Sequence, residues 1–321
     1  MMPASPSGVL RGRAPAKINL GLAVTGARPD GYHELTSIFL RLDLADTLMV
    51  TPSRPGLPDT LRISGDPDCP VEDNLVLRAL AALRAALPGG AALPGLAITL
   101  DKRIPMGGGL AGGSTDAATA LRLAARAWAV PASATELLTL GARLGADVPF
   151  FVAGHAAALV TGIGERVAPL PALRARVGVL LVTPGFGMAT PAVFGAFDRL
   201  GAHPSGSVRL IMSLAARWRA GLDGPALAAQ APALRDANDL WPAVTALAPR
   251  MAQLRDLMED ILVTPALLTG SGSTLVALYP SGDEARHAAR RLTLSADPRV
   301  VTARVVATTD DQSPHDEGSD P

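Results

Sequence analysis

Alternating apolar and polar positions in the first half of the chain predict a sheet that is buried on one face. The alternation covers residues 18–24 and 34–50, and the short apolar run 96–100 predicts a further strand. Residues 145–162 are expected to form a loop that leads into one more strand. Strands therefore account for much of this half, and the segments between them have helical spacing.

Apolar residues three or four positions apart predict helices between these strands. One helix is expected over residues 73–87, with Asp73 or Asn74 as its N-cap. Another is expected over residues 134–144. A Pro-Gly-Gly sequence follows the first of them and is typical of a helix end.

A proline-rich stretch near residues 169–171 predicts a domain boundary. We expect one domain over residues 1–168, a second over 169–308 and a disordered acidic tail over 309–321. The second domain has an α+β pattern, with Ala/Leu-rich helices up to about residue 262. Its expected strands are 177–183, 274–279 and 300–308, and its last helix is 284–292.

The most informative segment follows the strand at 96–100 and contains five glycines within positions 107–113. This glycine density excludes regular structure, and Ser114 or Thr115 is expected to cap a helix that runs to about residue 129. Such a loop at a helix start is typical of a phosphate site, because free N–H groups point at oxygens that the bare backbone can approach. A flexible surface loop is the alternative, but the order of strand, glycine loop and helix favours the phosphate site.

Two common phosphate-binding patterns fit this segment less well. The Walker pattern GxxxxGK[ST] is absent, because no lysine follows the glycines. Gly107, Gly109 and Gly112 satisfy GxGxxG, but a dinucleotide fold needs a second parallel strand that ends in an acidic residue about 20 positions further on. Residues 128–131 instead lead into another helix, with Glu136 in its first turn. A dehydrogenase is therefore disfavoured.

The 321 residues include 29 basic and 29 acidic side chains, and 48% of them are hydrophobic. This balance excludes a global positive field that would hold a nucleic acid or an anionic membrane, and the apolar content supports a large core. Five acidic residues and no Lys or Arg lie in 309–321, so the remaining chain has a mild positive bias that suits a phosphorylated small molecule. We expect no nucleic-acid partner, and a monomer or a homodimer.

Cysteine use and hydropathy bear on location. Cys69 is the only cysteine, which excludes an intramolecular disulfide and a cysteine-rich zinc site and favours a reducing cytoplasm. The longest mostly apolar stretch, 148–163, is shorter than the ~20 residues that span a bilayer, and the N-terminus has no secretory signal pattern. We expect a cytoplasmic protein without a membrane span. The histidines other than His33 have no metal-ligand spacing, so the sequence identifies no metal ligands.

Only two of the 29 basic residues, Lys17 and Lys102, are lysines. In a chain that otherwise uses arginine, a lysine indicates a position that needs a compact ammonium. Both lie beside other signals, Lys102 just before the glycine loop and Lys17 in the predicted strand region.

The segment 105–118, PMGGGLAGGSTDAA, resembles the phosphate-binding motif of the superfamily that includes galactokinase, homoserine kinase and mevalonate kinase, the GHMP kinases. Four further segments resemble the signatures of one branch, the kinases of a cytidine diphosphate-linked methylerythritol. They are APAKINLGL (14–22), GARPDGYHEL (26–35), LGADVPFF (144–151) and LLTGSGS (267–273). The matches keep their order from about residue 14 to 279, and the GxRxDGYH and PAKxNL patterns narrow the resemblance to this branch.

The resemblance implies transfer of the ATP γ-phosphate to the 2-hydroxyl of 4-diphosphocytidyl-2-C-methyl-D-erythritol, a step of the non-mevalonate isoprenoid pathway, with Mg²⁺ as cofactor. It implies an α+β, two-domain GHMP kinase fold with an S5-like nucleotide-binding half and a ferredoxin-like C-terminal half. The active site is then expected in the cleft between them. Two alternatives remain open: a GHMP kinase for another small alcohol, and a non-catalytic ligand sensor on the same fold.

By resemblance, Asp147 is the catalytic aspartate and Lys17 is its lysine partner. Asp147 can accept the proton of an attacking alcohol while Lys17 stabilises charge on the attacking or transferred oxygens. Because the ordinary pKa of Asp is ~3.9, much of the rate must come from positioning and electrostatics. Taken singly, Lys17 is also explained as a strand lysine that extends to solvent, and Asp147 as a loop carboxylate before a proline. Their joint fit to one motif set favours the catalytic roles.

The resemblance also assigns substrate contacts. Tyr32 and Phe194 are expected to stack on opposite faces of the cytosine, while His33 forms a hydrogen bond with the base. A phenylalanine at helical spacing is equally typical of core packing, which is the alternative interpretation of Phe194. Asn19 and Thr190 match positions that contact the substrate or its phosphates.

Nucleotide contacts are assigned to the glycine motif and to Asn74 and Lys102, which match positions that contact adenine. The chain departs from the family at Ala111, where many members have Gly, and at Thr115, where Ser is usual. The methyl group of Ala111 matters only if φ there is positive. The expected cofactor-binding residues are Asn74, Lys102, Pro105, Met106, Gly107, Gly108, Gly109, Leu110, Ala111, Gly112, Gly113, Ser114 and Thr115.

Overall fold

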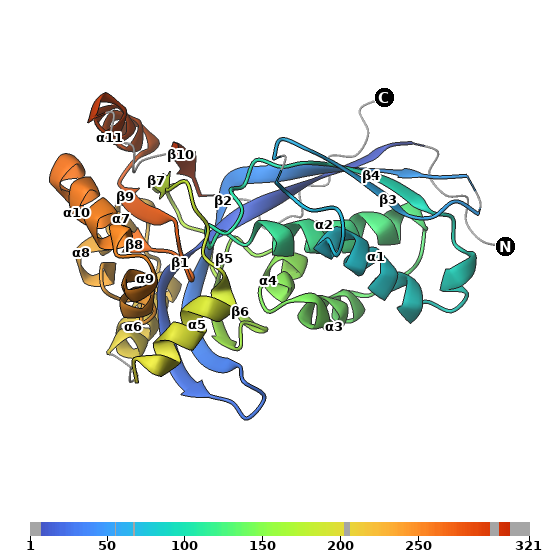
Figure 1. Ribbon diagram of the computed structural model, residues 1–321, viewed down its shortest axis with the longest axis horizontal. Helices are drawn as coiled ribbons and strands as arrows, with labels where there is room; N and C mark the ends of the chain where they lie inside the picture. The colour runs from blue at the N-terminus through green and yellow to red at the C-terminus, as the bar shows by residue number, and fades with distance from the viewer. Residues whose placement is uncertain (1–7, 55, 67, 202–205, 296–301, 309–321) are drawn as a thin grey trace.

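Two sheets, each covered by helices, lie side by side and are linked by two long strands (Figure 1). The computed structural model describes residues 8–54, 56–66, 68–201, 206–295 and 302–308. The predicted disordered tail lies outside these residues. No helix of the described part is both long enough and apolar enough to cross a membrane.

The linking strands are β1 (Leu10–Ala27) and β2 (His33–Pro52), which pair antiparallel along their whole length. Both are longer than the predicted strands. Residues 14–24 of β1 are buried without interruption, because helices of the two halves cover its opposite faces. Alternation of apolar and polar residues is lost where both faces are buried, so the alternation predicts a strand shorter than the observed one.

The first sheet has the order β3-β4-β2-β5-β6, with β1 on the remaining edge of β2. Its other strands are β3 (Thr60–Ser64), β4 (Leu96–Asp101), β5 (Ala157–Gly162) and β6 (Arg166–Leu170). The helices of this half are α1 (Leu75–Ala86), α2 (Gly112–Ala127), α3 (Ala134–Leu144) and α4 (Val148–Ala153), with a short 3₁₀ turn, η1 (Gly90–Ala92). The helix predicted over 134–144 is confirmed with the same bounds, whereas α4 lies in a segment expected to be a loop.

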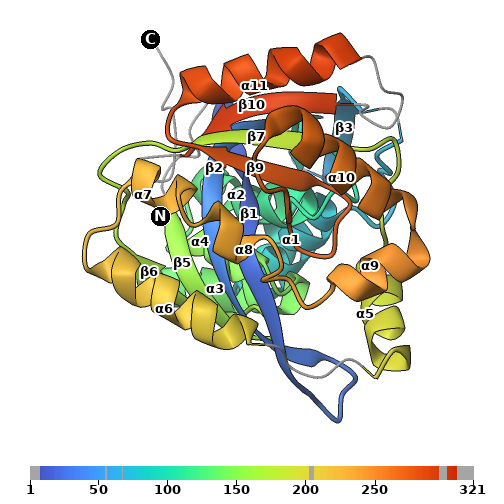
Figure 2. The same cartoon turned by 90° about the vertical axis from the view of Figure 1, so that its left-hand side faces the viewer.

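The second sheet has the order β10-β7-β9-β8, and its paired strands are antiparallel. The strands are β7 (Gly178–Thr183), β8 (Leu267–Leu268), β9 (Leu275–Tyr279) and β10 (Thr302–Ala307). Helices connect β7 to β8, and α11 (Gly282–Ser295) connects β9 to β10 on the outer face (Figure 2). This β-α-β-β-α-β order confirms the expected ferredoxin-like half.

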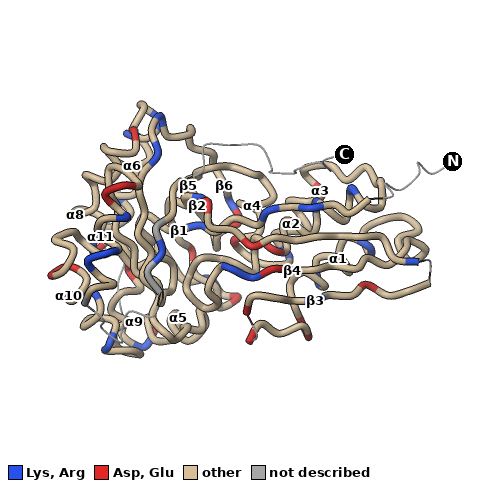
Figure 3. Tube along the Cα trace, turned by 90° about the horizontal axis from the view of Figure 1, so that it is seen from above, with Lys and Arg blue, Asp and Glu red and all other residues tan. Residues whose placement is uncertain are grey.

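The helices between β7 and β8 cover the second sheet and reach β1. They are α5 (Thr190–Arg199), α6 (Ser207–Arg219), α7 (Gly224–Ala228), α8 (Ala231–Leu234), α9 (Trp241–Leu247) and α10 (Arg250–Leu262). Trp218 of α6 belongs to the same buried cluster as Ile18 of β1 and Val179 of β7. The two halves therefore share a core, and the domain boundary near 169–171 stays a prediction. Basic and acidic residues are interspersed over both halves (Figure 3).

Candidate active site

The two residues expected to carry the chemistry lie together although they come from distant parts of the chain. Lys17 lies in β1, and Asp147 is the N-cap residue of α4. The Lys17 Nζ lies 3.3 Å from the Asp147 Oδ2. The Lys17 side chain is 4% exposed and that of Asp147 is 27% exposed. The ammonium is thus buried behind a carboxylate that a substrate can reach.

Further contacts fix Lys17 in place. Its Nζ donates to the Asn19 Oδ1 at 2.7 Å and lies 4.4 Å from the centre of the Phe39 ring. Asn19 donates from Nδ2 to the Ser37 Oγ at 2.8 Å, and its backbone N–H donates to the Thr269 Oγ1 of the second half at 2.9 Å. Asn19 therefore positions the ammonium and joins the two halves at the site.

The glycine loop packs against the second half of the chain. A Cβ at Gly109 would collide with the carbonyl oxygen of Thr269, and a Cβ at Gly107 would lie 2.8 Å from the Gly187 Cα. Both glycines also have positive φ, 75° and 65° respectively, which L side chains rarely adopt. These glycines are required for contact between the two halves, and close approach of this backbone to a phosphate stays a prediction.

Helix α2 starts earlier than predicted. Its N-cap residue is Ala111, with φ 58°, and no side chain caps the helix, so the prediction that Ser114 or Thr115 is the N-cap is wrong. Packing of Gly107 and Gly109 against the second half sets the backbone of the loop, and the helix starts directly after it. The first N–H groups of an α-helix have no partner within it, and Gly112, Gly113 and Ser114 line the cavity described below. The positive end of the helix dipole therefore lies where a phosphate is expected.

Lys102, Asp46 and Asp116 form a buried cluster at the base of the glycine loop. The Lys102 Nζ donates to the Asp46 Oδ2 and, at 2.8 Å, to the Asp116 Oδ2. The other oxygen of Asp46 accepts from the backbone N–H groups of Arg103 and Ile104. The cluster therefore connects β2 to the residues that precede the loop and to the first turn of α2 behind it.

The two carboxyl groups of this cluster have different surroundings. Burial raises the pKa of Asp116 to about 8, with Lys102 opposing the shift and Asp46 adding to it. Burial lowers the pKa of Lys102, but the two carboxylates outweigh burial and the net shift is upward. The Asp116 Oδ1 is buried without a hydrogen-bond partner, whereas Asp46 is stabilised by two backbone donors. Burial thus favours the protonated form of Asp116 at the base of the glycine loop.

The residues expected to contact adenine are only partly brought to the cavity. Lys102 lines it, with two ammonium hydrogens already donated to carboxylates. Asn74 is the N-cap of α1, accepts from the Val76 N–H at 3.0 Å and does not line the cavity. Thr115 is buried in α2 and also lies outside the lining. Nucleotide contacts by Asn74 and Thr115 stay predictions.

The residues expected to hold the cytosine come from the β1–β2 turn, the first residue of β2 and α5. The turn and α5 lie side by side in both ribbon views (Figures 1 and 2). The His33 ring stacks on the Phe194 ring, with centres 4.9 Å apart and planes at 26°. The His33 Nε2 lies 2.7 Å from the Asp198 Oδ1. Tyr32 is 58% exposed. Phe194 is half-buried against His33, so one face of its ring is already covered.

One cavity of about 760 Å³ brings most of the expected site residues together. Most residues of the glycine loop line it, as do Lys17, Asn19 and Asp147 of the first half and Thr190 and Phe194 of the second. Its volume is typical of small-molecule sites. The chain segments that build it therefore come from both halves, as expected for a cleft between two domains.

The sequence did not indicate a role for segment 235–241, which contacts both the loop at 269–273 and strand β1. Asn238 is buried and donates from Nδ2 to the carbonyl oxygens of Leu268 and Gly270, at 3.0 and 2.9 Å. The residues on either side of Asn238 pair with Leu22 of β1. The segment thus joins the loop at 269–273 to the strand that carries Lys17. An Asn-Asp pair between helices is the signal in the sequence, and it is equally typical of an ordinary turn.

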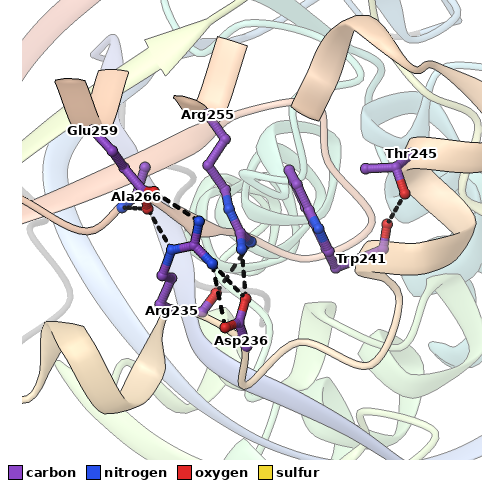
Figure 4. Close-up of polar contacts among 7 residues, drawn as sticks. All are labelled: Arg235, Asp236, Trp241, Thr245, Arg255, Glu259 and Ala266. Atoms are coloured by element: carbon purple, nitrogen blue, oxygen red, sulfur yellow. Dashed lines mark hydrogen bonds and ion pairs between the residues drawn. The ribbon is translucent and has the colours of Figure 1, made fainter. Parts of the chain in front are cut away.

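Two ion pairs hold the ends of this segment (Figure 4). Arg235 donates to both carboxylate oxygens of Glu259 at 2.7 Å. Arg255 donates to Asp236 and lies 4.1 Å from the centre of the Trp241 ring. Burial acts to raise the pKa of Glu259, but hydrogen bonds from Arg235 outweigh burial and the pKa is lowered. The segment is therefore fixed by charged pairs on α10.

Family models and known proteins agree with this geometry. The GHMP kinases N terminal domain matches residues 74–155, and the GHMP kinases C terminal domain matches residues 225–296. The chain is 40% identical to a 4-diphosphocytidyl-2-C-methyl-D-erythritol kinase of Streptomyces avermitilis, over 91% of this chain and 95% of that protein. It is 36% identical to the kinase of the same name from Salinibacter ruber, over 87% and 93%.

Solved structures give the same picture. A crystal structure of 4-(cytidine 5'-diphospho)-2C-methyl-D-erythritol kinase superposes with a TM-score of 0.69 at 33% identity, over 92% of this chain and 98% of that chain. A homoserine kinase from Cytophaga hutchinsonii superposes with a TM-score of 0.70 at 18% identity, which shows a common fold. The resemblance found in the sequence is therefore confirmed: the chain belongs to the GHMP kinases and, within them, to the 4-diphosphocytidyl-2-C-methyl-D-erythritol kinase family.

Proposed function

We propose that this chain transfers the γ-phosphoryl group of ATP to the 2-hydroxyl of 4-diphosphocytidyl-2-C-methyl-D-erythritol, in the isoprenoid pathway that does not use mevalonate. The observation that carries the proposal is the Lys17–Asp147 pair, with 3.3 Å between the ammonium and the carboxylate, in the cavity lined by the glycine loop. Kinases at 36–40% identity over most of the chain carry this substrate in their names.

The reaction forms a bond between the substrate 2-oxygen and the γ-phosphorus and breaks the bond between that phosphorus and the bridging oxygen of ADP. The hydroxyl proton passes to the Asp147 carboxylate as the new bond forms. Lys17 stabilises the negative charge on the oxygens around the phosphorus. Asn19 holds Lys17 at 2.7 Å, so the ammonium is oriented before substrate binds.

The residues present fit a polyphosphate with Mg²⁺. The first turn of α2 offers backbone N–H groups to phosphate oxygens, and Asp30 and Asp147 are the carboxylates of the cavity lining. No cluster of three or more metal-ligating side chains occurs among the described residues. This fits a Mg²⁺ ion bound largely by phosphates and one or two carboxylates. When bound, Mg²⁺ supplies charge neutralisation on the phosphates.

A coupled ADP-release assay on the purified chain tests this function. We expect ADP release with 4-diphosphocytidyl-2-C-methyl-D-erythritol and background rates with homoserine or mevalonate. Turnover of homoserine or mevalonate alone would assign the chain to another small-alcohol kinase, and nucleotide binding without any turnover would assign a sensor. The buried ammonium beside an accessible carboxylate speaks against the sensor, because ligand binding alone does not need that pair. We place the reaction in the cytoplasm, because a chain with one cysteine suits a reducing compartment. We take the enzyme to be a monomer or a homodimer.

A further inference from the structure

His33 is surrounded by three side chains of α5. Phe194 and Asp198 are four residues apart, so they lie on the same face of the helix. Phe194 stacks on the imidazole, Phe197 meets it edge-on with ring centres 6.1 Å apart, and the Asp198 Oδ1 lies 2.7 Å from the His33 Nε2. His33 is 9% exposed. The ring therefore has a fixed plane and one fixed hydrogen bond.

The carboxylate of Asp198 determines which nitrogen of His33 carries the hydrogen. An ionised carboxylate only accepts hydrogen bonds, so the Nε2 of His33 must be the donor in this contact. In a neutral imidazole with its hydrogen on Nε2, the other nitrogen, Nδ1, is an acceptor. His33 also lines the cavity, whereas Asp198 does not. Asp198 can therefore affect a ligand in the cavity only through His33.

We propose that Asp198 is a positioning residue that makes this site selective for cytosine over uracil. Held as the Nε2–H tautomer, His33 offers a Nδ1 acceptor to the exocyclic amine of cytosine. Uracil carries a carbonyl oxygen where cytosine carries that amine, so two acceptors would face each other and one would stay unpaired. The inference rests on the proposed function, because it takes the ligand to be a cytidine diphosphate compound.

Nitrogen chemical shifts of the histidine rings test the tautomer without any turnover. We expect His33, assigned by its absence in His33→Gln, to show one protonated nitrogen at Nε2 and one unprotonated nitrogen at Nδ1. In Asp198→Ala we expect a mixture of tautomers. Asp198→Asn retains an acceptor oxygen at the same position, so it should restore the single tautomer. A His33 that carries its hydrogen on Nδ1, or on both nitrogens, in the unchanged chain overturns the proposal.

Kinetics with two substrates test the selectivity. The unchanged chain should prefer the cytidine compound to its uridine counterpart, and Asp198→Ala should lower this preference in kcat/KM about tenfold, through the KM of the alcohol substrate. The KM for ATP should stay within about twofold, and Asp198→Asn should recover most of the preference. Asp283→Ala is the matched control, because Asp283 lies on α11 and pairs with Arg286. An unchanged preference in Asp198→Ala refutes the role.

Direct binding keeps this inference separate from the proposed function. Calorimetry with cytidine 5'-diphosphate and uridine 5'-diphosphate needs no phosphoryl transfer. Preference for cytidine that depends on Asp198, together with no turnover, would refute the kinase function and support the cytosine selectivity. Turnover together with equal binding of both nucleotides by the unchanged chain would support the kinase function and refute the cytosine selectivity.

Discussion

The Lys17 ammonium lies 3.3 Å from the Asp147 carboxylate, and this contact joins the middle of a long strand to the first residue before a short helix. The strand is fixed on both faces by helices of the two halves, and the helix begins one residue after Asp147. Both groups are therefore held by rigid elements, which is what alignment of a hydroxyl with a phosphorus atom requires.

Replacing the carboxylate should remove catalysis while leaving nucleotide binding intact. In Asp147→Asn the amide keeps the shape but cannot accept a proton, so we expect kcat to fall by about 10²–10⁴. The Kd for ATP, measured by calorimetry without Mg²⁺, should change by less than about threefold, because the glycine loop is untouched. Turnover equal to that of the unchanged chain would remove the assignment of Asp147 as base.

The exposed ring of Tyr32 should affect the binding of the cytidine substrate and not the binding of ATP. Tyr32 is 58% exposed and lines the cavity, and loss of base–aromatic stacking typically costs ~1–3 kcal/mol. Tyr32→Ala should raise the KM of the cytidine substrate about tenfold or more and leave the KM for ATP unchanged, whereas Tyr32→Phe should behave as the unchanged chain. Equal effects on both KM values would contradict the stacking role.

Two substitutions in the glycine loop should have opposite effects on stability. Ala111 has φ 58°, a conformation that costs an L residue ~1–2 kcal/mol. Glycine adopts it freely but loses more entropy on folding, so Ala111→Gly should raise the free energy of unfolding by about 0.5–1 kcal/mol. Gly109→Ala should lower it, because the new Cβ meets the Thr269 carbonyl. Urea denaturation measures both, and a destabilised Ala111→Gly would contradict the argument.

The buried carboxyl of Asp116 should make the protein less stable at alkaline pH. Its folded pKa of about 8 lies above the unfolded value of ~3.9, so its contribution is complete below the unfolded value and is lost as pH rises through the folded pKa. Between pH 6 and 9 the free energy of unfolding should therefore fall, and in Asp116→Asn the fall should be smaller by about 1–2 kcal/mol. Asp101→Asn, the half-buried pair partner of the exposed Arg103, is the control. Parallel curves for Asp116→Asn and the unchanged chain would contradict the assignment.

The Arg235–Glu259 ion pair should make the free energy of unfolding depend on pH in the acid range. The pKa of Glu259 is lowered on folding, so its contribution is present above the unfolded pKa of ~4.3 and is lost as pH falls through the folded value. Glu259→Gln should lower the free energy of unfolding by about 1 kcal/mol at pH 7 and by less at pH 3. Asp260→Asn on the same helix is the control. A loss in Glu259→Gln that is the same at both pH values would show that charge is not involved.

Local features of the site were determined by the sequence itself. Five glycines between a strand and a helix predict a loop with free N–H groups whatever the rest of the fold is. The helix at 134–144 was predicted, and the N-cap of α1 was narrowed to Asp73 or Asn74, because spacing and caps act within a few residues. The resemblance of short motifs added the family, and with it the pairing of Lys17 with Asp147.

Contacts between distant segments were decided only by the tertiary structure. The N-cap of α2 fell on Ala111, because packing of the glycine loop against the second half sets the backbone there. The contact of His33 with Asp198 depends on how α5 packs against the start of β2, and the contact of Asn238 with the loop at 269–273 depends on how segment 235–241 packs against β1. No local pattern encodes that packing. Side-chain spacing fixes which face of an element is apolar, whereas the register and docking of elements follow from the combined burial of many residues, which one segment of sequence does not contain.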